Sequence, residues 1–260
     1  MSGMMNEREL LEWYLEAGVD AICGDKPLTA SAVVRPGLSV SAAVSADTRP
    51  AITDLAQMSL TACKNARDIC DKASSLEELA AGVERFEGCA LKLTANKTVF
   101  GDGDEHAKVL FVGEAPGADE DRMGKPFVGR SGHLLDKMLS AVGISRSECY
   151  ITNILMWRPP GNRTPTGAEV AVCLPFLKKK IELINPRVIV ALGAPAANAL
   201  LDAEDPISRI RGKWLEYAPK PGVSVPLLPM FHPAYLLRNP AQKAKSWLDL
   251  IKLSKKLSNN

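Results

Sequence analysis

The chain has 260 residues, of which 46% are hydrophobic and 24% are charged. This length leaves room for one α/β domain of ordinary size and an appendage, and the composition excludes a disordered chain and a fibrous repeat. No apolar run approaches the roughly 18 residues that a membrane span requires, and acidic residues stand where a signal peptide would be apolar. We therefore expect a cytoplasmic, monomeric protein that makes no contact with membranes and keeps its six cysteines reduced.

The net charge of +2 hides an uneven distribution along the chain. Residues 1–121 contain 11 Lys and Arg against 21 Asp and Glu, whereas residues 122–260 contain 21 against 9. A basic half on a near-neutral chain favours a face that binds a polyanion such as nucleic acid. Charge alone leaves open the alternative of an uneven solvated surface without such a partner.

The first 85 residues have their own pattern. Apolar residues at helical spacing predict a short helix within 7–18 and two further helices at about 52–73 and 75–86. The last of these opens with SSLEE, which is typical of a serine N-cap followed by glutamates in the first turn. Residues 25–50 are rich in Ala, Ser, Val and Pro and predict a linker. We expect residues 1–85 to form a helical extension, separate from a domain at 86–260.

From residue 108 onward, short apolar runs alternate with helical stretches. The runs cover residues 108–113, 149–155, 187–193 and 225–231, and helices are expected near 131–142, 167–184, 195–202 and 243–257. Near-continuous apolar strands separated by helices indicate a parallel sheet that is covered on both faces. We predict an α/β fold of three layers, α/β/α, around a central four-stranded, mainly parallel sheet.

Ligands bind beyond the carboxyl ends of the strands in such a sheet. Glu114 follows the first run in a Gly/Pro-rich loop, Asn153 lies near the end of the second run, and His232 follows the fourth. A carboxylate, a carboxamide and an imidazole should therefore meet at one rim, where they suit a polar heterocycle. Taken singly, each has a structural alternative as a capping, turn or core hydrogen-bonding residue.

Several motifs occur together in the order known from one enzyme family. They read GEAPG, GKPFVGRSGHLLDKML, YITNILMWRPPGNRTPT, VIVALGAPAANALL, ISRIRGKW and LPMFHPAYLLRNP. This set resembles the family 4 uracil-DNA glycosylases over about residues 86–253. The resemblance implies a base-excision repair enzyme that hydrolyses the bond between uracil and deoxyribose in DNA, single- or double-stranded, after the base is extruded. The alternative is a DNA- or protein-binding member of the superfamily without glycosylase activity.

The resemblance also assigns roles to individual residues. Asn153 would read the edge of uracil, because a carboxamide offers one donor and one acceptor side by side. Phe127 would stack on the base, unless it is a plain core residue, and His232 would donate to uracil O2. Glu114 would lie near the sugar, where it either orients water or stabilises positive charge. The backbone N–H groups of Glu114 and Ala115 are further candidates for binding the base.

Cations and apolar residues of the basic half are candidates for DNA contacts. Arg158 and Arg163 flank a stiff proline-containing loop next to Asn153. The other candidates are Arg209, Arg211, Lys213, Leu236, Leu237 and Arg238. The two leucines would fill the gap that a flipped base leaves, or they simply pack in the core. We interpret residues 178–180, a run of three lysines, as cations that favour a helix C-terminus rather than as a DNA contact.

One motif departs from the family. The resembling enzymes usually hold an iron–sulfur cluster with four cysteines, and only Cys89 and Cys173 match those positions here. Lys92 and Trp157 stand at the other two. Since a [4Fe–4S] cluster normally needs four protein ligands, we expect no metal and no cofactor. The indole of Trp157 and the stem of Lys92 would occupy the volume of the cluster.

Overall fold

The computed structural model describes residues 52–220 and 222–258. The helix expected within residues 7–18 and the linker expected at 25–50 lie outside these ranges. None of the helices in the described part of the chain is both long and apolar enough to cross a bilayer.

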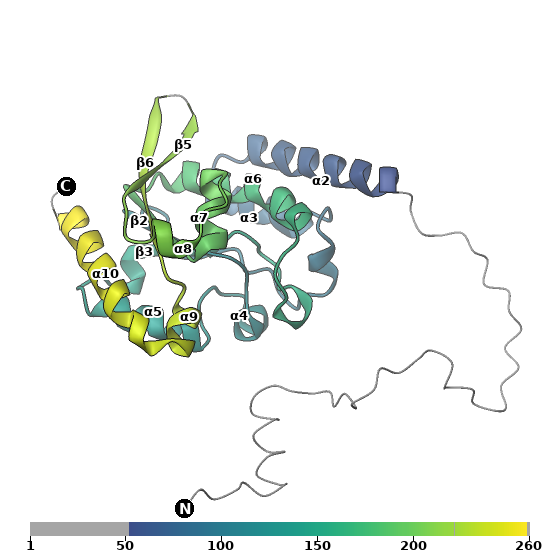
Figure 1. Ribbon diagram of the computed structural model, residues 1–260. Coiled ribbons are helices and arrows are strands. Elements are labelled where there is room, and N and C mark those ends of the chain that lie inside the picture. The colour runs from purple at the N-terminus through teal and green to yellow at the C-terminus, as the bar shows by residue number, and fades with distance from the viewer. Residues whose placement is uncertain (1–51, 221, 259–260) are drawn as a thin grey trace, which may run out of the picture. The chain divides into compact units, whose positions relative to one another are not determined.

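A six-stranded sheet forms the centre of the described chain (Figure 1). The strands are β1 (Asp102–Gly103), β2 (Val109–Gly113), β3 (Cys149–Asn153), β4 (Val188–Leu192), β5 (Leu215–Lys220) and β6 (Val223–Met230). Their spatial order is β1-β3-β2-β4-β6-β5. The four inner strands are parallel and are the four that the sequence predicts. The antiparallel edge strands β1 and β5 were missed, because β1 has only two residues and β5 contains a proline that is untypical of strands.

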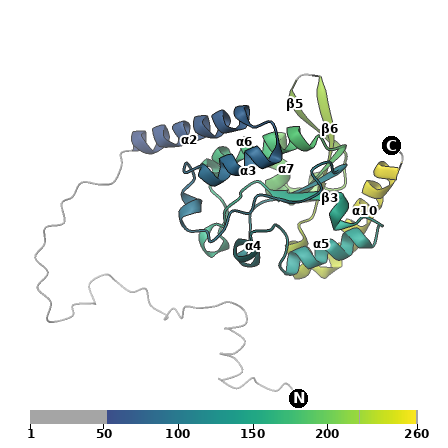
Figure 2. The same ribbon diagram turned by 180° about the vertical axis from the view of Figure 1, so that it is seen from behind.

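Helices cover both faces of the sheet. They are α2 (Ile52–Lys72), α3 (Leu76–Arg85), α4 (Ala118–Met123), α5 (Arg130–Ser140), α6 (Gly167–Ile184), α7 (Ala194–Leu201), α8 (Ile207–Ile210), α9 (Pro233–Arg238) and α10 (Lys243–Ser258). Figures 1 and 2 show α6 and α7 on one side and α5 and α10 on the other. The predicted three-layer α/β/α fold is thus confirmed.

The layers follow from the alternation of side chains along buried strands. All five residues of β2 are buried. Leu110 and Val112 belong to the core that contains residues of α6 and α7, whereas Val109 and Phe111 belong to the core that contains residues of α5 and α10. Because successive side chains point to opposite faces, a strand covered on both sides reads as a continuous apolar run.

The helices α2 and α3 share a core with the sheet domain. Ser75 caps α3 as predicted, since its hydroxyl accepts a 3.1 Å hydrogen bond from the backbone N–H of Glu78. Ala66 in α2 and Leu79 in α3 are buried in the same cluster as Leu177 of α6, and the described residues belong to one compact unit. The division expected between residues 85 and 86 therefore does not coincide with a break in packing.

Candidate active site

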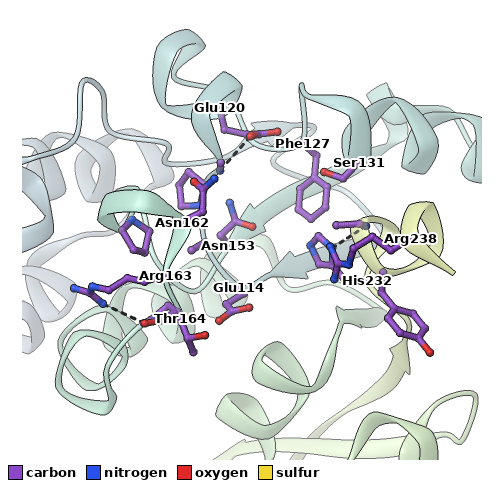
Figure 3. A pocket seen from close by; sticks show the side chains of 17 residues that line it. Glu114, Glu120, Phe127, Ser131, Asn153, Asn162, Arg163, Thr164, His232 and Arg238 are labelled. Atoms are coloured by element: carbon purple, nitrogen blue, oxygen red, sulfur yellow. Dashed lines mark hydrogen bonds between the residues drawn. The ribbon is translucent and has the colours of Figure 1, made fainter. Parts of the chain in front are cut away.

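A cavity of about 400 Å³ opens at the carboxyl ends of the parallel strands. Its walls come from the loop after β2, the end of β3, the loop after β3 and the start of α9 (Figure 3). It brings together all five residues that the resemblance assigns to the base and the sugar, namely Glu114, Ala115, Phe127, Asn153 and His232. The volume lies within the range of small-molecule sites and accommodates a single nucleobase.

Asn153 lies at the back of the cavity with 2% of its surface exposed. It is the last residue of β3 and pairs in register with Gly113 of β2. A Cβ atom at Gly113 would lie 2.3 Å from Asn153 Oδ1 and 2.7 Å from the ring of Phe127, so the glycine makes room for both side chains. Oδ1 of Asn153 is buried and has no hydrogen-bond partner among the described residues. Such an acceptor is costly unless a ligand supplies the missing donor.

The ring of Phe127 forms a wall next to Asn153 (Figure 3). Phe127 has a φ angle of 51°, in the left-handed region that residues with a side chain rarely adopt. The ring is buried and lies beside the imidazole of His232. A strained conformation next to a cavity is typical of a functional position that the surrounding structure holds in place.

Two side chains that the sequence analysis missed hold the loop of Phe127. Arg146 donates hydrogen bonds from its guanidinium to the backbone carbonyls of Pro126 (2.6 Å) and Phe127 (3.0 Å). The Glu120 carboxylate accepts 2.9 Å hydrogen bonds from the N–H groups of residues 128 and 129, and one of 3.1 Å from that of residue 117. Glu120 therefore ties the loop after β2 to the loop of Phe127. Glu120 ends the stretch GEAPGADE, so its position next to a motif of the cavity could have identified it from the sequence. No local pattern identifies Arg146.

His232 presents a defined tautomer to the cavity. It is the N-cap of α9, and its Nδ1 accepts a 3.1 Å hydrogen bond from the N–H of Ala234. Burial, with a smaller contribution from Arg238, lowers the pKa of His232 from 6.5 to about 4. The imidazole is therefore neutral at pH 7, and its proton sits on Nε2, where it can be donated to a ligand.

Glu114 follows β2 and lines the cavity below Asn153 (Figure 3). Burial raises the pKa of its carboxyl group above the ordinary value. No hydrogen bond or ion pair joins this carboxylate to another described residue. A half-buried carboxylate of this kind can stabilise positive charge or polarise a water molecule.

A family model described as the uracil DNA glycosylase superfamily matches residues 100–251, which include every element that lines the cavity. The chain belongs to this superfamily. A type-4 uracil-DNA glycosylase of Thermotoga maritima is 44% identical over 165 residues, which are 63% of this chain and 84% of the relative. The type-4 enzyme of Archaeoglobus fulgidus is 40% identical over 183 residues, or 69% of this chain and 92% of the relative. The type-4 enzyme of Pyrobaculum aerophilum is 39% identical over 179 residues, which are 67% of this chain and 91% of the relative.

The cluster position of this superfamily member does not fit a [4Fe–4S] group. Cys89 and Cys173 are free and buried in one core cluster, where each thiol shifts the pKa of the other, and the described residues contain no group of three or more His, Cys, Asp or Glu that could hold a metal. Trp157 is 1% exposed, donates from Nε1 to the Thr98 hydroxyl at 3.2 Å and packs on Phe86.

Lys92, at the other substituted cluster position, faces the backbone. Its ammonium donates to the carbonyls of Glu84 (2.5 Å) and Phe86 (3.0 Å), at the end of α3. An ammonium bound to carbonyl oxygens cannot replace a thiolate as an iron ligand. The indole and the lysine therefore both contact Phe86, which follows the end of α3.

The loop that carries Arg158 and Arg163 forms the opposite wall of the uracil-DNA glycosylase cavity (Figure 3). Arg163 forms two hydrogen bonds of 2.9 and 2.6 Å with the Glu169 carboxylate, and this pairing lowers the pKa of Glu169 to about 2. Arg158 donates from Nε to Asn162 Oδ1 at 2.8 Å, and Asn162 itself lines the cavity. Both arginines thus stiffen this loop, in addition to any contact with DNA.

Of three expected DNA contacts in and after α8, one has a structural partner and two are exposed. Arg211 pairs with the carboxylate of Asp249, which is 1% exposed, so it is a structural residue. Arg209 is exposed next to Asp205, at 3.5 Å, and Lys213 is exposed, but neither lines the cavity. Their part in binding DNA stays a prediction.

The two neighbouring leucines of α9 lie in different environments. Leu236 is 0% exposed, so it packs in the core and is not available as a wedge. Leu237 is partly exposed, and Arg238 is exposed and lines the cavity. Because helix positions 236 and 237 point in different directions, one of the two faces the core and the other can face a ligand.

Proposed function

We propose that this chain is a DNA repair glycosylase that hydrolyses the N-glycosidic bond of uracil in DNA and leaves an abasic site. The observation that carries the proposal is the buried Oδ1 of Asn153, which has no hydrogen-bond partner in the described part of the chain and lies in one cavity with an aromatic ring and a neutral imidazole donor. The names of the relatives, type-4 uracil-DNA glycosylases, support the same reaction.

Base recognition follows from the donors and acceptors of uracil. The N3–H of uracil donates to Asn153 Oδ1, and uracil O4 accepts from the amide N–H of the same side chain. Cytosine presents the reverse pattern, so its binding would leave buried polar groups unpaired. A site built in this way discriminates strongly between the two bases. Phe127 covers the face of the base, and the methyl group of Ala115, which also lines the cavity, narrows the space at its edge.

Bond cleavage places positive charge on the sugar and negative charge on uracil. The Nε2–H of His232 donates to uracil O2 as the negative charge develops there, an effect worth about 10² to 10³ in rate for a single donor. Water attacks C1′, the bonding electrons leave with uracil as its anion, and the proton that the water loses passes through the solvent to that anion. Glu114 acts near the sugar, either by orienting this water or by stabilising the oxocarbenium ion, and the two roles stay open.

We further propose that the chain works without a metal or another cofactor. The buried indole of Trp157, the ammonium of Lys92 on backbone carbonyls and the single remaining cysteine pair support this proposal. Iron and acid-labile sulfide are measured on protein purified without oxygen. We expect less than about 0.5 iron per chain, whereas a value near four, the content of a [4Fe–4S] cluster, contradicts the proposal.

Uracil-containing DNA is the proposed partner, and no membrane partner is proposed. Activity on single- and double-stranded DNA, a monomeric state and a cytoplasmic location stay predictions from the sequence. The excess of cations in residues 122–260 supports binding to a polyanion.

A single-uracil oligonucleotide, single- or double-stranded, tests the proposed activity. We expect strand cleavage only after alkali, because the enzyme produces an abasic site and does not itself cut the strand. Binding without cleavage would instead favour the non-catalytic DNA-binding alternative. Cleavage without alkali would show an additional lyase activity and contradict the simple hydrolase.

A further inference from the structure

Lys180 is buried in the middle of the domain. It lies in α6 and is 0% exposed, although the sequence groups it with two lysines near a helix end. Its ammonium donates to the carbonyl of Phe100 at 2.5 Å and to the hydroxyl of Thr152 at 3.1 Å. It also lies 4.1 Å from the centroid of the Phe100 ring. The position therefore differs from that of a solvated helix-end cation.

Burial lowers the pKa of Lys180 from 10.5 to about 7. Besides burial, the thiols of Cys70 and Cys173 are the titratable groups that influence the pKa of Lys180. Their own pKa values are raised, so both thiols are neutral near pH 7. Isolated buried cations are costly. A neutral amine still retains two N–H groups, so both hydrogen bonds of Lys180 persist in either state.

The carbonyl of Phe100 joins three segments of the chain. It accepts from Lys180 of α6 and also from the hydroxyl of Thr152 in β3, at 2.8 Å. Phe100 belongs to a strap, residues 96–103, which runs beside β3. The strap is bound at one end through Asn96 to the carboxylate of Asp121 in α4, and at the other end it forms β1. Lys180 thus links the strap and β3 to the helix layer behind them.

Thr152 immediately precedes Asn153 at the carboxyl end of β3. The two side chains point to opposite faces of the strand, with Thr152 toward Lys180 and Asn153 toward the cavity. Oδ1 of Asn153 has no hydrogen-bond partner of its own in the described chain. The position of the carboxamide therefore depends on the backbone of β3 and on its packing against Gly113 and Phe127.

We propose that Lys180 is a positioning residue for uracil recognition: through Thr152 and the Phe100 carbonyl it holds the end of β3, and with it the carboxamide of Asn153. This inference rests on the proposed glycosylase function. A misplaced carboxamide weakens the hydrogen bonds to the edge of the base. It does not alter contacts to the DNA backbone, which come from other parts of the surface.

The inhibition constant of free uracil tests this role. It does not depend on the fraction of active enzyme, so a variant that is only less stable keeps the wild-type value. We expect Thr152→Val, which is nearly isosteric and has no hydroxyl, and Lys180→Met each to weaken uracil inhibition about tenfold, the effect of losing about 1.4 kcal/mol of hydrogen bonding. Affinity for DNA that contains an abasic-site analogue should change less than about twofold.

Thr152→Ser and Lys178→Met are the matched controls. The serine keeps the hydroxyl, and Lys178 is an exposed residue of the same helix. Both variants should therefore keep the wild-type inhibition constant for uracil and the wild-type rate of uracil release. Combining Thr152→Val with Lys180→Met should add little to either change alone, because both remove the same link.

Three outcomes overturn the inference. Unchanged uracil inhibition in folded Thr152→Val contradicts it even where Lys180→Met fails to fold. Equal losses of affinity for uracil and for abasic DNA indicate a general structural defect instead. A wild-type chain that releases no uracil overturns the proposed function and this inference together, whereas an active wild type with unaffected variants overturns the inference alone.

Discussion

The imidazole of His232 and the ring of Phe127 lie 5.5 Å apart between centroids, with their planes inclined by 33°. The two residues are far apart in the sequence, and in the fold they form adjoining walls of one cavity. Asn153 lines the same cavity to one side of both rings (Figure 3). A planar base that contacts the Phe127 ring therefore presents its hydrogen-bonding edges to Asn153 and His232.

Asn153→Asp should reduce uracil release by about 10² to 10³, because a carboxylate cannot donate to uracil O4 and repels the developing anion. Single-turnover rates on a uracil oligonucleotide measure the effect. Asn65→Asp, on the exposed surface of α2, is the matched control and should keep the wild-type rate. A loss of less than tenfold for Asn153→Asp would contradict its role as reader of the base.

His232→Ala should slow bond cleavage by about 10²-fold, since one donor to the developing anion is lost. The exposed His106 provides the control substitution to alanine. Because burial lowers the pKa of His232 to about 4, the wild-type rate should not require protonation of this group between pH 5 and 9. A rate that rises with imidazole protonation near pH 6.5 would show that the cationic form acts.

The same pKa shift makes the stability of the fold depend on pH. Between pH 6.5 and 4 the unfolded chain binds a proton at His232 and the folded chain does not. The free energy of unfolding should therefore decrease as the pH falls through this window, by a contribution that His232→Ala removes. Urea unfolding of the wild type and of His232→Ala at pH 7 and pH 4.5 provides the comparison. An equal loss of unfolding free energy between these pH values in both proteins would contradict the prediction.

Arg146→Met should destabilise the protein by about 1–3 kcal/mol, because the carbonyls of Pro126 and Phe127 lose their donor. The activity should fall as well, since Phe127 then relaxes from its left-handed backbone conformation. Thermal unfolding and uracil release are the measurements, with the exposed Arg85→Met as control. Full activity in a folded Arg146→Met protein would show that the loop does not need this support.

Trp157→Ala should cost about 3–5 kcal/mol of stability, the usual range for removing a large buried aromatic side chain. Trp247→Ala, at a position that is 43% exposed, should cost far less. Denaturant unfolding compares the two variants. Similar small losses in both would mean that the indole of Trp157 does not fill the cluster volume as a packed core residue.

Leu237→Ala should lower activity on double-stranded DNA more than on single-stranded DNA, because only a duplex leaves a gap when the base flips. Leu236→Ala should instead destabilise the fold by about 2–5 kcal/mol, since this side chain is fully buried. Parallel rate and unfolding measurements on both variants separate the roles. A duplex-specific defect in a stable Leu236→Ala protein would reverse the assignment.

The sequence alone was sufficient for the parallel strands and for the layers, because a strand covered on both faces is a continuous apolar run that no exposed segment imitates. It was not sufficient for β5, whose pairing with β6 depends on contacts across a turn that contains Gly222. The sequence also did not show that α2 and α3 share the core of the domain. The apolar spacing of a helix indicates which of its sides is buried, but not against which surface that side packs.

Local sequence determined which chemical groups the site contains: Glu114 and His232 follow predicted strands, Asn153 lies near the end of one, and the motif order carried the family. Tertiary structure alone decided what those groups can do. Burial and the hydrogen bond from Ala234 set the charge and tautomer of His232, and the buried link from Lys180 to Thr152 becomes visible only when α6 lies against β3. The physical reason is that desolvation and hydrogen-bond partners come from residues distant in the chain, so the pattern around a residue does not encode them.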